Sequence, residues 1–355
     1  MSAPVLTSAA DEALAAWSRR NRRRALWTGL LGLLALAALT LDFFLGTAMT
    51  PGESWNALWG IGGATSRQSF IMHDLRAPPA LMAGLVGAAL ALAGAEMQTL
   101  LDNPLAEPFT LGVSGAAALG AGLALALGLR LPFVPQEWAV SANAFVMACA
   151  ALGALQALTR WRAGGPQTLI LFGVGLAFAF SAMVSLTQYL ASPEDLQQLV
   201  FWTLGSVQGA SWAQVALMAV VLALCVPFSL RAAWRLTALR LGAERAEGFG
   251  VDVGRLRRGA LARVSLLAAA AVSMAGIVGF VGLAAPHVAR RIVGEDHRFL
   301  LPASLFCGAA LMSFASAAIK IMASWNGVGL LPIGLMTTLI GLPVFFALIL
   351  RRRAA

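Results

Sequence analysis

Apolar residues run on for stretches of about 20 positions along most of this 355-residue chain, and no other feature constrains its fold as strongly. An α-helix needs about 20 apolar residues to cross a hydrocarbon core of roughly 30 Å. Within lipid, only helices and closed barrels satisfy all of their backbone N–H and C=O groups. The apolar stretches are continuous and do not alternate with polar residues, which favours helices over barrel strands. We therefore expect an all-α membrane protein.

Composition agrees with this expectation, because 59% of the residues are hydrophobic and only 12% are charged. A water-soluble domain carries roughly 25% charged residues, so a soluble fold is excluded. The hydropathy pattern predicts about ten spans, near 26–46, 80–101, 111–129, 138–159, 167–190, 210–230, 259–277, 280–293, 299–321 and 332–350. Small residues such as Gly84, Gly87, Ala91 and Gly94 predict close helix packing inside the second span.

The positive charge is distributed as membrane topology requires, and nucleic-acid binding is therefore not expected from the net charge of +9. With ten spans, 21 of the 25 Lys and Arg residues fall on the side of the chain termini. Arg67, Arg76, Arg130 and Lys320 fall on the other side. We expect a bacterial inner-membrane protein with both termini cytoplasmic. Its expected parts are a basic tail (1–25), a permease domain (26–350) with a cytoplasmic segment at 236–258, and a short tail (351–355).

The chain lacks the motifs of an energy-converting enzyme. Its one lysine, Lys320, lies in no phosphate-binding loop, so ATP hydrolysis is not expected from this chain. The three histidines and three cysteines form no metal-ligand spacing, and we expect no bound metal, cofactor or catalytic residue. Asp42 and Glu96 are the clear acidic residues within spans. They leave open an ion-coupled secondary transporter as an alternative, because such carriers place carboxylates in the membrane.

Three irregular segments carry the functional hypotheses. Two prolines interrupt 101–108, which forms either a tight turn or a gate. The charged stretch 239–255 forms either a helix on the membrane surface or a docking lever for a soluble motor subunit. The outer cations Arg76 and Lys320 either extend to the lipid headgroups or bind acidic side chains of an external protein.

These segments resemble the permease subunits of ABC importers for iron–siderophore complexes, haem and cobalamin, the type II importers. The likeness covers nearly the whole chain after residue 70. The matching motifs are Leu75-Arg76, NPLAEP (103–108), LGVSGA (111–116), LG to GV (241–251), GFVGL (279–283), PHVAR (286–290), DHR (296–298), LPIG (331–334) and GLP (341–343).

The resemblance implies ten transmembrane helices per subunit in a homodimer, with the path along the dimer axis. It also implies two cytoplasmic ABC ATPase subunits, which use ATP and Mg, and a periplasmic substrate-binding protein. Asn103, Leu105, Gln167 and Thr168 match gates of the family. Small path walls are expected at Gly173, Gly175, Ser181 and Ser185. The ATPase coupling residues are expected to be Leu241, Gly242, Glu244, Arg245, Gly250, Asp252 and Arg257, and the docking residues Arg76 and Lys320.

The chain departs from the family pattern at two outer positions. Pro79 stands where a second Arg is frequent, and 325–329 looks like a local insertion that leaves Lys320 to act as the usual basic residue. The expected function is ATP-driven import of a bulky metal chelate, with haem first, ferric siderophores second and cobalamin third. No ligand-specific residue carries this ranking, because substrate choice is expected to reside in the binding protein.

Overall fold

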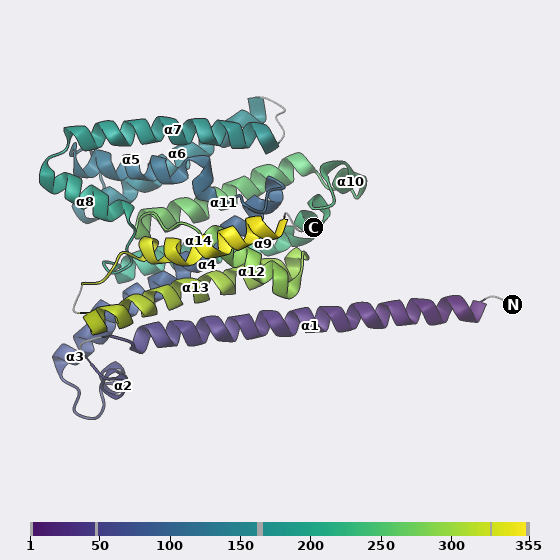
Figure 1. The fold of residues 1–355 in the computed structure, drawn as a ribbon, viewed down its shortest axis with the longest axis horizontal. Helices are drawn as coiled ribbons and strands as arrows, with labels where there is room; N and C mark the ends of the chain where they lie inside the picture. Colours follow the sequence, from purple (N-terminus) through teal and green to yellow (C-terminus); the bar gives the residue numbers. More distant parts are fainter. Residues whose placement is uncertain (1–2, 47–48, 162–165, 327–328, 353–355) are drawn as a thin grey trace.

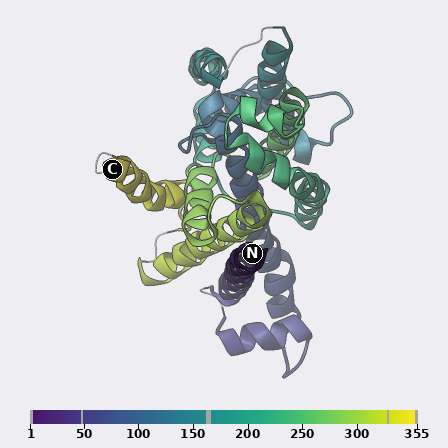
Figure 2. The same cartoon turned by 90° about the vertical axis from the view of Figure 1, so that its right-hand side faces the viewer.

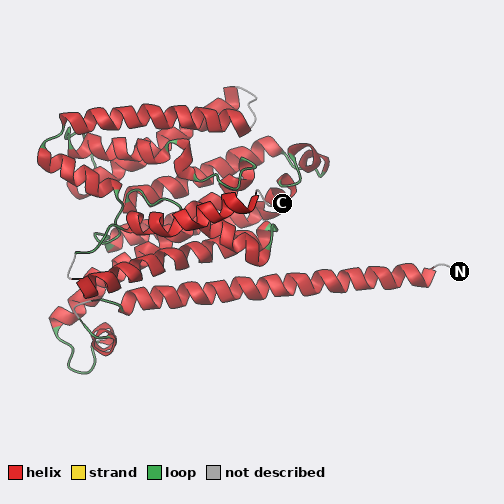
Figure 3. Ribbon diagram, viewed as in Figure 1, coloured by secondary structure: helices red, strands yellow, loops and turns green. Residues whose placement is uncertain are grey.

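The computed structural model is a bundle of helices (Figures 1 and 3), and it describes residues 3–46, 49–161, 166–326 and 329–352. Within these ranges it contains no strand. The long helices are α1 (Ala3–Phe44), α4 (Ala77–Leu100), α5 (Val113–Leu125), α6 (Ala139–Trp161), α7 (Pro166–Leu190), α9 (Trp212–Leu239), α11 (Val253–Ala275), α12 (Val281–Val293), α13 (His297–Asn326) and α14 (Ile333–Arg352). The short helices are α2 (Pro51–Trp59), α3 (Ser66–Phe70), α8 (Pro193–Thr203) and α10 (Ala243–Gly248).

The ten long helices correspond one to one with the ten predicted spans, so the all-α prediction is confirmed. Seven stretches in the described residues are long and apolar enough to cross a membrane, and α5 and the apolar part of α14 are shorter. The second span begins earlier than predicted, because α3 and a π-helical stretch (Ile71–Arg76) lead into α4 without a break. Helix α8 was not predicted. Gly327 and Val328 of the expected insertion lie outside the described residues.

Helix α1 differs most from the prediction. The expected tail at 1–25 is not a separate segment, because its described part continues the first span as one helix of 42 residues. At 1.5 Å per residue, a helix of this length extends about 60 Å, well beyond a hydrocarbon core. The N-terminal part of α1 stands clear of the other helices in Figure 1.

Helix α4 lies at the centre of the bundle. In its most apolar stretch, 83% of the residues are buried, against 11% in α7 at the edge. Glycine allows this packing. A Cβ on Gly87 would collide with the carbonyl oxygen of Gly308 in α13, and a Cβ on Gly94 would collide with that of Gly282 in α12. The predicted close packing of these glycines is confirmed.

The bundle has two distinct ends (Figure 1). Both chain termini and α10 lie at one end, whereas α2, α3 and α8 lie at the other. Figure 2 looks onto the end that carries the termini. This arrangement agrees with the predicted grouping of the basic segments on one side of the membrane.

Gly87→Ala tests the glycine contact between α4 and α13. The added methyl group meets the backbone of Gly308, so we expect a loss of about 1–3 kcal/mol of stability, typical of overpacking. Thermal unfolding of the detergent-purified protein measures this loss. The matched control is Gly153→Ala in α6, where a Cβ would meet no atom within 4 Å. Equal stability of the two variants would contradict the predicted contact.

Candidate functional site

The predicted gate segment is a compact turn at the end of α4. Asn103 donates its backbone N–H to the carbonyl of Gln98 (3.0 Å), and its Oδ1 accepts the backbone N–H of Leu105 (3.0 Å). The side chains of Asn103 and Leu105 are both half-buried. Pro104 cannot continue a helical hydrogen-bond pattern, and the Asn side chain replaces the missing backbone bond. The tight turn is therefore present, and the gate role of Asn103 and Leu105 stays a prediction.

A close backbone approach at Gly112 holds the end of the loop against α7. Gly112 has φ +84°, and a Cβ there would lie 3.0 Å from the backbone nitrogen of Ala177. This φ lies in the left-handed region, where glycine is favoured. The end of the loop that follows Asn103 therefore packs directly on the helix that carries the other predicted gate residues.

Only some of the residues predicted on α7 come together. Thr168 and Gly175 line one apolar groove of about 440 Å³ between α6 and α7, with Leu158, Leu171, Phe172 and Leu176. Gln167 is exposed beside it, and Gly173 is buried. Ser181 and Ser185 are exposed one turn apart, and the Ser185 hydroxyl donates to the carbonyl of Ser181 (3.0 Å). Their small, accessible side chains are compatible with a path wall, which stays a prediction.

The predicted coupling segment forms a small exposed projection. Gly242 (φ +104°) and Gly250 (φ +80°) flank α10, and both need backbone angles that other residues rarely adopt. Leu241, Glu244 and Arg245 are exposed, while Ala246 anchors α10 in the core. Asp252 accepts the backbone N–H of Arg255 (2.8 Å) and so caps α11. Arg257 is half-buried on the first turns of α11.

The structure places Arg76 and Lys320, the predicted docking residues, inside the bundle, and their docking role stays a prediction. Both are buried, with 7% and 8% of their surface exposed. Arg76 donates to the hydroxyl of Ser54 in α2 (2.9 Å). Lys320 lies 2.8 Å from the Asp42 carboxylate and donates to the Asp42 carbonyl (2.7 Å). These cations therefore connect helices, and a docking protein would meet their neighbours.

The two acidic residues that kept an ion-coupled carrier open are both paired. Asp42 forms an ion pair with Lys320. The Glu96 carboxylate accepts hydrogen bonds from Nε and Nη2 of Arg263 at 3.0 and 2.6 Å. The sequence analysis singled out Glu96 but missed Arg263, because the two residues are 167 positions apart. In this structure, therefore, both carboxylates face a cationic side chain of the chain itself.

Glu107 is a further ionisable group in the loop that follows the predicted gate. Burial raises the pKa of its carboxyl to about 7, and a hydrogen bond from the backbone N–H of Phe280 opposes this rise. Phe280 has φ +68° and precedes the first residue of α12. The Glu107 carboxyl thus binds the loop after α4 to the start of α12.

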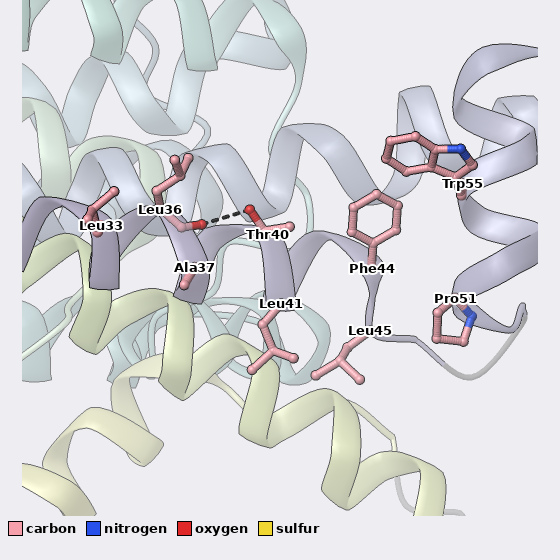
Figure 4. Close-up of a pocket in the computed structure, with 9 residues that line it drawn as sticks. All are labelled: Leu33, Leu36, Ala37, Thr40, Leu41, Phe44, Leu45, Pro51 and Trp55. Atoms are coloured by element: carbon pink, nitrogen blue, oxygen red, sulfur yellow. Dashed lines mark hydrogen bonds between the residues drawn. The ribbon is translucent and has the colours of Figure 1, made fainter.

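A larger apolar groove lies between the C-terminal end of α1 and helix α2 (Figure 4). It measures about 720 Å³ and is bounded by Leu41, Phe44, Pro51 and Trp55, among others, from α1 and α2. The hydroxyl of Thr40 on its edge is bonded to the carbonyl of Leu36 (2.8 Å). None of the predicted gate, path or coupling residues lines this groove.

Comparison with known proteins agrees with this arrangement. Residues 33–351 match the model of the FecCD transport family. The hemin transport system permease protein HmuU of Yersinia pestis is 33% identical over 91% of this chain and 96% of its own length. The vitamin B12 import system permease protein BtuC of Vibrio cholerae is 35% identical over 84% of this chain and 88% of its own. A solved structure, an inward-facing conformation of a putative metal-chelate type ABC transporter, aligns with a TM-score of 0.79 at 30% identity, over 91% of this chain and 98% of that chain.

Lys320→Met tests the assignment of Lys320 as a residue that connects helices. Removing one partner leaves Asp42 buried and uncompensated, so we expect a loss of about 3–5 kcal/mol of stability. Asp42→Asn combined with Lys320→Met should recover most of this loss in thermal unfolding. If Lys320→Met keeps wild-type stability but abolishes binding of the external partner, the result supports the docking role and contradicts the assignment of Lys320 as a connection between helices.

Glu107→Gln tests the raised pKa in the loop. A carboxyl whose folded-state pKa lies above the unfolded value of 4.5 stabilises the fold fully only below pH 4.5. That stabilisation is lost as the pH rises from 4.5 to about 7. Above pH 7 this group causes no further change in stability. We expect the wild-type melting temperature to fall over this window relative to that of Glu107→Gln. The exposed Glu137→Gln serves as control, and parallel pH profiles for wild type and Glu107→Gln would contradict the assignment.

Proposed function

The chain belongs to the FecCD transport family and is the permease of an ABC importer for hemin-, vitamin B12- or siderophore-type chelates, and we propose that within this class it carries haem. Its fold is that of a type II importer permease. It is a transport subunit, and ATP hydrolysis belongs to separate ATPase partners. The family match over nearly the whole chain is the observation that carries this conclusion.

The proposed energy source is a pair of cytoplasmic ABC ATPase subunits that dock on α10. Two observations support this docking: Leu241, Glu244 and Arg245 are exposed, and α10 lies at the end of the bundle that carries both termini. Closure of the ATPase dimer on ATP would move α10 together with α9 and α11. The cavity would then change the side of the membrane to which it opens, as in other rigid-body transport cycles.

In the proposed homodimer, the two copies of the permease contact each other along α7. This helix leaves most of its apolar surface uncovered within one chain, including Leu171, Phe178 and Leu186. A second copy on this face would enclose a path lined by Gly175, Ser181 and Ser185 from both chains. Small side chains and hydroxyl groups bind a large chelate weakly, which suits a ligand that must be released.

Haem is the proposed cargo, with ferric siderophores second and cobalamin third. The ranking is supported by the likeness to the hemin permease of Yersinia pestis over 91% of this chain. A periplasmic substrate-binding protein would deliver the chelate to the end of the bundle that holds α2, α3 and α8. The corresponding location is the bacterial inner membrane, with both termini in the cytoplasm.

Uptake by proteoliposomes tests the proposal. Vesicles with this chain, its cognate ATPase and its binding protein should accumulate hemin in preference to cyanocobalamin or ferric hydroxamate, and only with ATP. Arg245→Glu, on the exposed face of α10, should reduce ATP-driven uptake about tenfold or more by disturbing ATPase docking, whereas Arg298→Gln should not. If the vesicles accumulate cyanocobalamin in preference to hemin, cobalamin replaces haem as the proposed cargo. Uphill accumulation by the purified chain alone would contradict the proposed energy source.

A further inference from the structure

Three arginines from three different elements converge on the end of α4. Arg263 of α11 binds Glu96, Arg290 of α12 donates to Gln98 (3.0 Å), and Arg240, which follows α9, binds Asp102 (3.3 Å). The three acceptors cover the last turn and a half of α4 and the residue before Asn103. Together, the three arginines and their three acceptors are called the arginine clamp below.

The contact between Arg263 and Glu96 is the strongest part of the clamp. Nε and Nη2 of Arg263 donate to the two carboxylate oxygens at 3.0 and 2.6 Å. The side chain of Glu96 is fully buried, and that of Arg263 is 13% exposed. A two-pronged contact between planar groups fixes orientation as well as distance. In this buried setting water competes little, so the contact is screened far less than a surface pair.

The other two arginines are connected through a shared acid. Glu295, in the turn between α12 and α13, lies 3.1 Å from Arg240 and 3.0 Å from Arg290. The contacts therefore close a ring from Asp102 through Arg240, Glu295 and Arg290 back to Gln98. This network connects the ends of α4, α9 and α12, and its contact with Asp102 lies at the surface.

The order of the elements along the chain links the arginine clamp to α10 on one side and to the gate turn on the other. Helix α10 lies between α9 and α11, and each of these neighbours supplies one arginine. Arg240 stands three residues before α10, and Arg263 lies ten residues, about 15 Å, into α11. On the receiving side, Asp102 immediately precedes the predicted gate residue Asn103. A displacement of α10 would thus reach the gate turn through two ionic contacts, Arg240 with Asp102 and Arg263 with Glu96.

We propose that the arginine clamp is the device that transmits movement of α10 to the gate turn, with Arg240, Arg263 and Arg290 as positioning residues. The inference rests on the proposed function, because it requires a motor subunit on α10. It also explains why charge is kept in this part of the bundle. A two-pronged contact fixes orientation as well as distance, so α4 would follow a movement of α11.

The test follows the gate turn directly in the complete importer. Leu105→Cys is introduced after replacing Cys149, Cys225 and Cys307 by Ala, and the complex with ATPase and binding protein is placed in vesicles. The labelling rate of this cysteine with a water-soluble maleimide is measured without nucleotide and with ATP plus vanadate. A working clamp gives a rate that depends on nucleotide.

Arg263→Gln and Arg240→Gln should reduce the nucleotide-dependent difference about fivefold or more, the lower range of coupling between distant sites, while ATP hydrolysis stays within about twofold of wild type. Arg240 is partly exposed, so its variant is expected to fold even if Arg263→Gln does not. The swapped pair Glu96→Arg with Arg263→Glu should restore part of the response. Arg298→Gln is the matched control, because Arg298 pairs with Asp296 and has no hydrogen bond or ion pair with α4 among the described residues.

Three results would overturn the proposal. A full nucleotide response in both Arg240→Gln and Arg263→Gln would show that the clamp transmits nothing. Parallel loss of ATP hydrolysis, melting temperature and response would identify the arginines as structural anchors only. Absence of any response in the importer with an intact clamp, despite ATP hydrolysis, would overturn the proposed coupling through α10 and the clamp with it.

Discussion

Charge buried away from water is the constraint around which the bundle is organised. Removing an ion from water costs several kcal/mol even after relaxation, unless a partner of opposite charge is held in good geometry. Two buried acids meet that condition with cations from distant parts of the sequence, Asp42 with Lys320 and Glu96 with Arg263. Each pair joins two long helices, so the same contacts that offset the desolvation also fix which helices are neighbours.

The two pairs lie toward opposite ends of the bundle and suit different tasks. Lys320 forms an ion pair with the carboxylate of Asp42 and donates a hydrogen bond to its backbone carbonyl, which fastens α13 to the end of α1. Arg263 instead joins the helix after α10 to the helix before the gate turn. A static contact is useful where the ends of two helices must stay together. A directional contact is useful where one helix must follow another.

The sequence predicted the helical class, the ten long helices and the two irregular segments at 101–108 and 239–255, because these follow from local hydropathy and from proline and glycine. It did not predict α8 or the helical state of the region before residue 25, since neither depends on a membrane-spanning length of apolar residues. It also did not predict the partners of Arg76 and Lys320 within the bundle. Local sequence shows that a cation stands at a membrane boundary, but not that Ser54 or Asp42 lies beside it. Arg263 was missed for the same reason, because its partner lies 167 residues away.

Helix α1 has a mechanical consequence of its own. A rod of 42 residues without an internal break turns a small rotation inside the bilayer into a larger excursion of its free end. A tilt of about 5° swings a tip roughly 60 Å away by about 5 Å, comparable to one helical turn. The part of α1 that stands clear of the other helices would therefore move farthest in any rocking of the bundle.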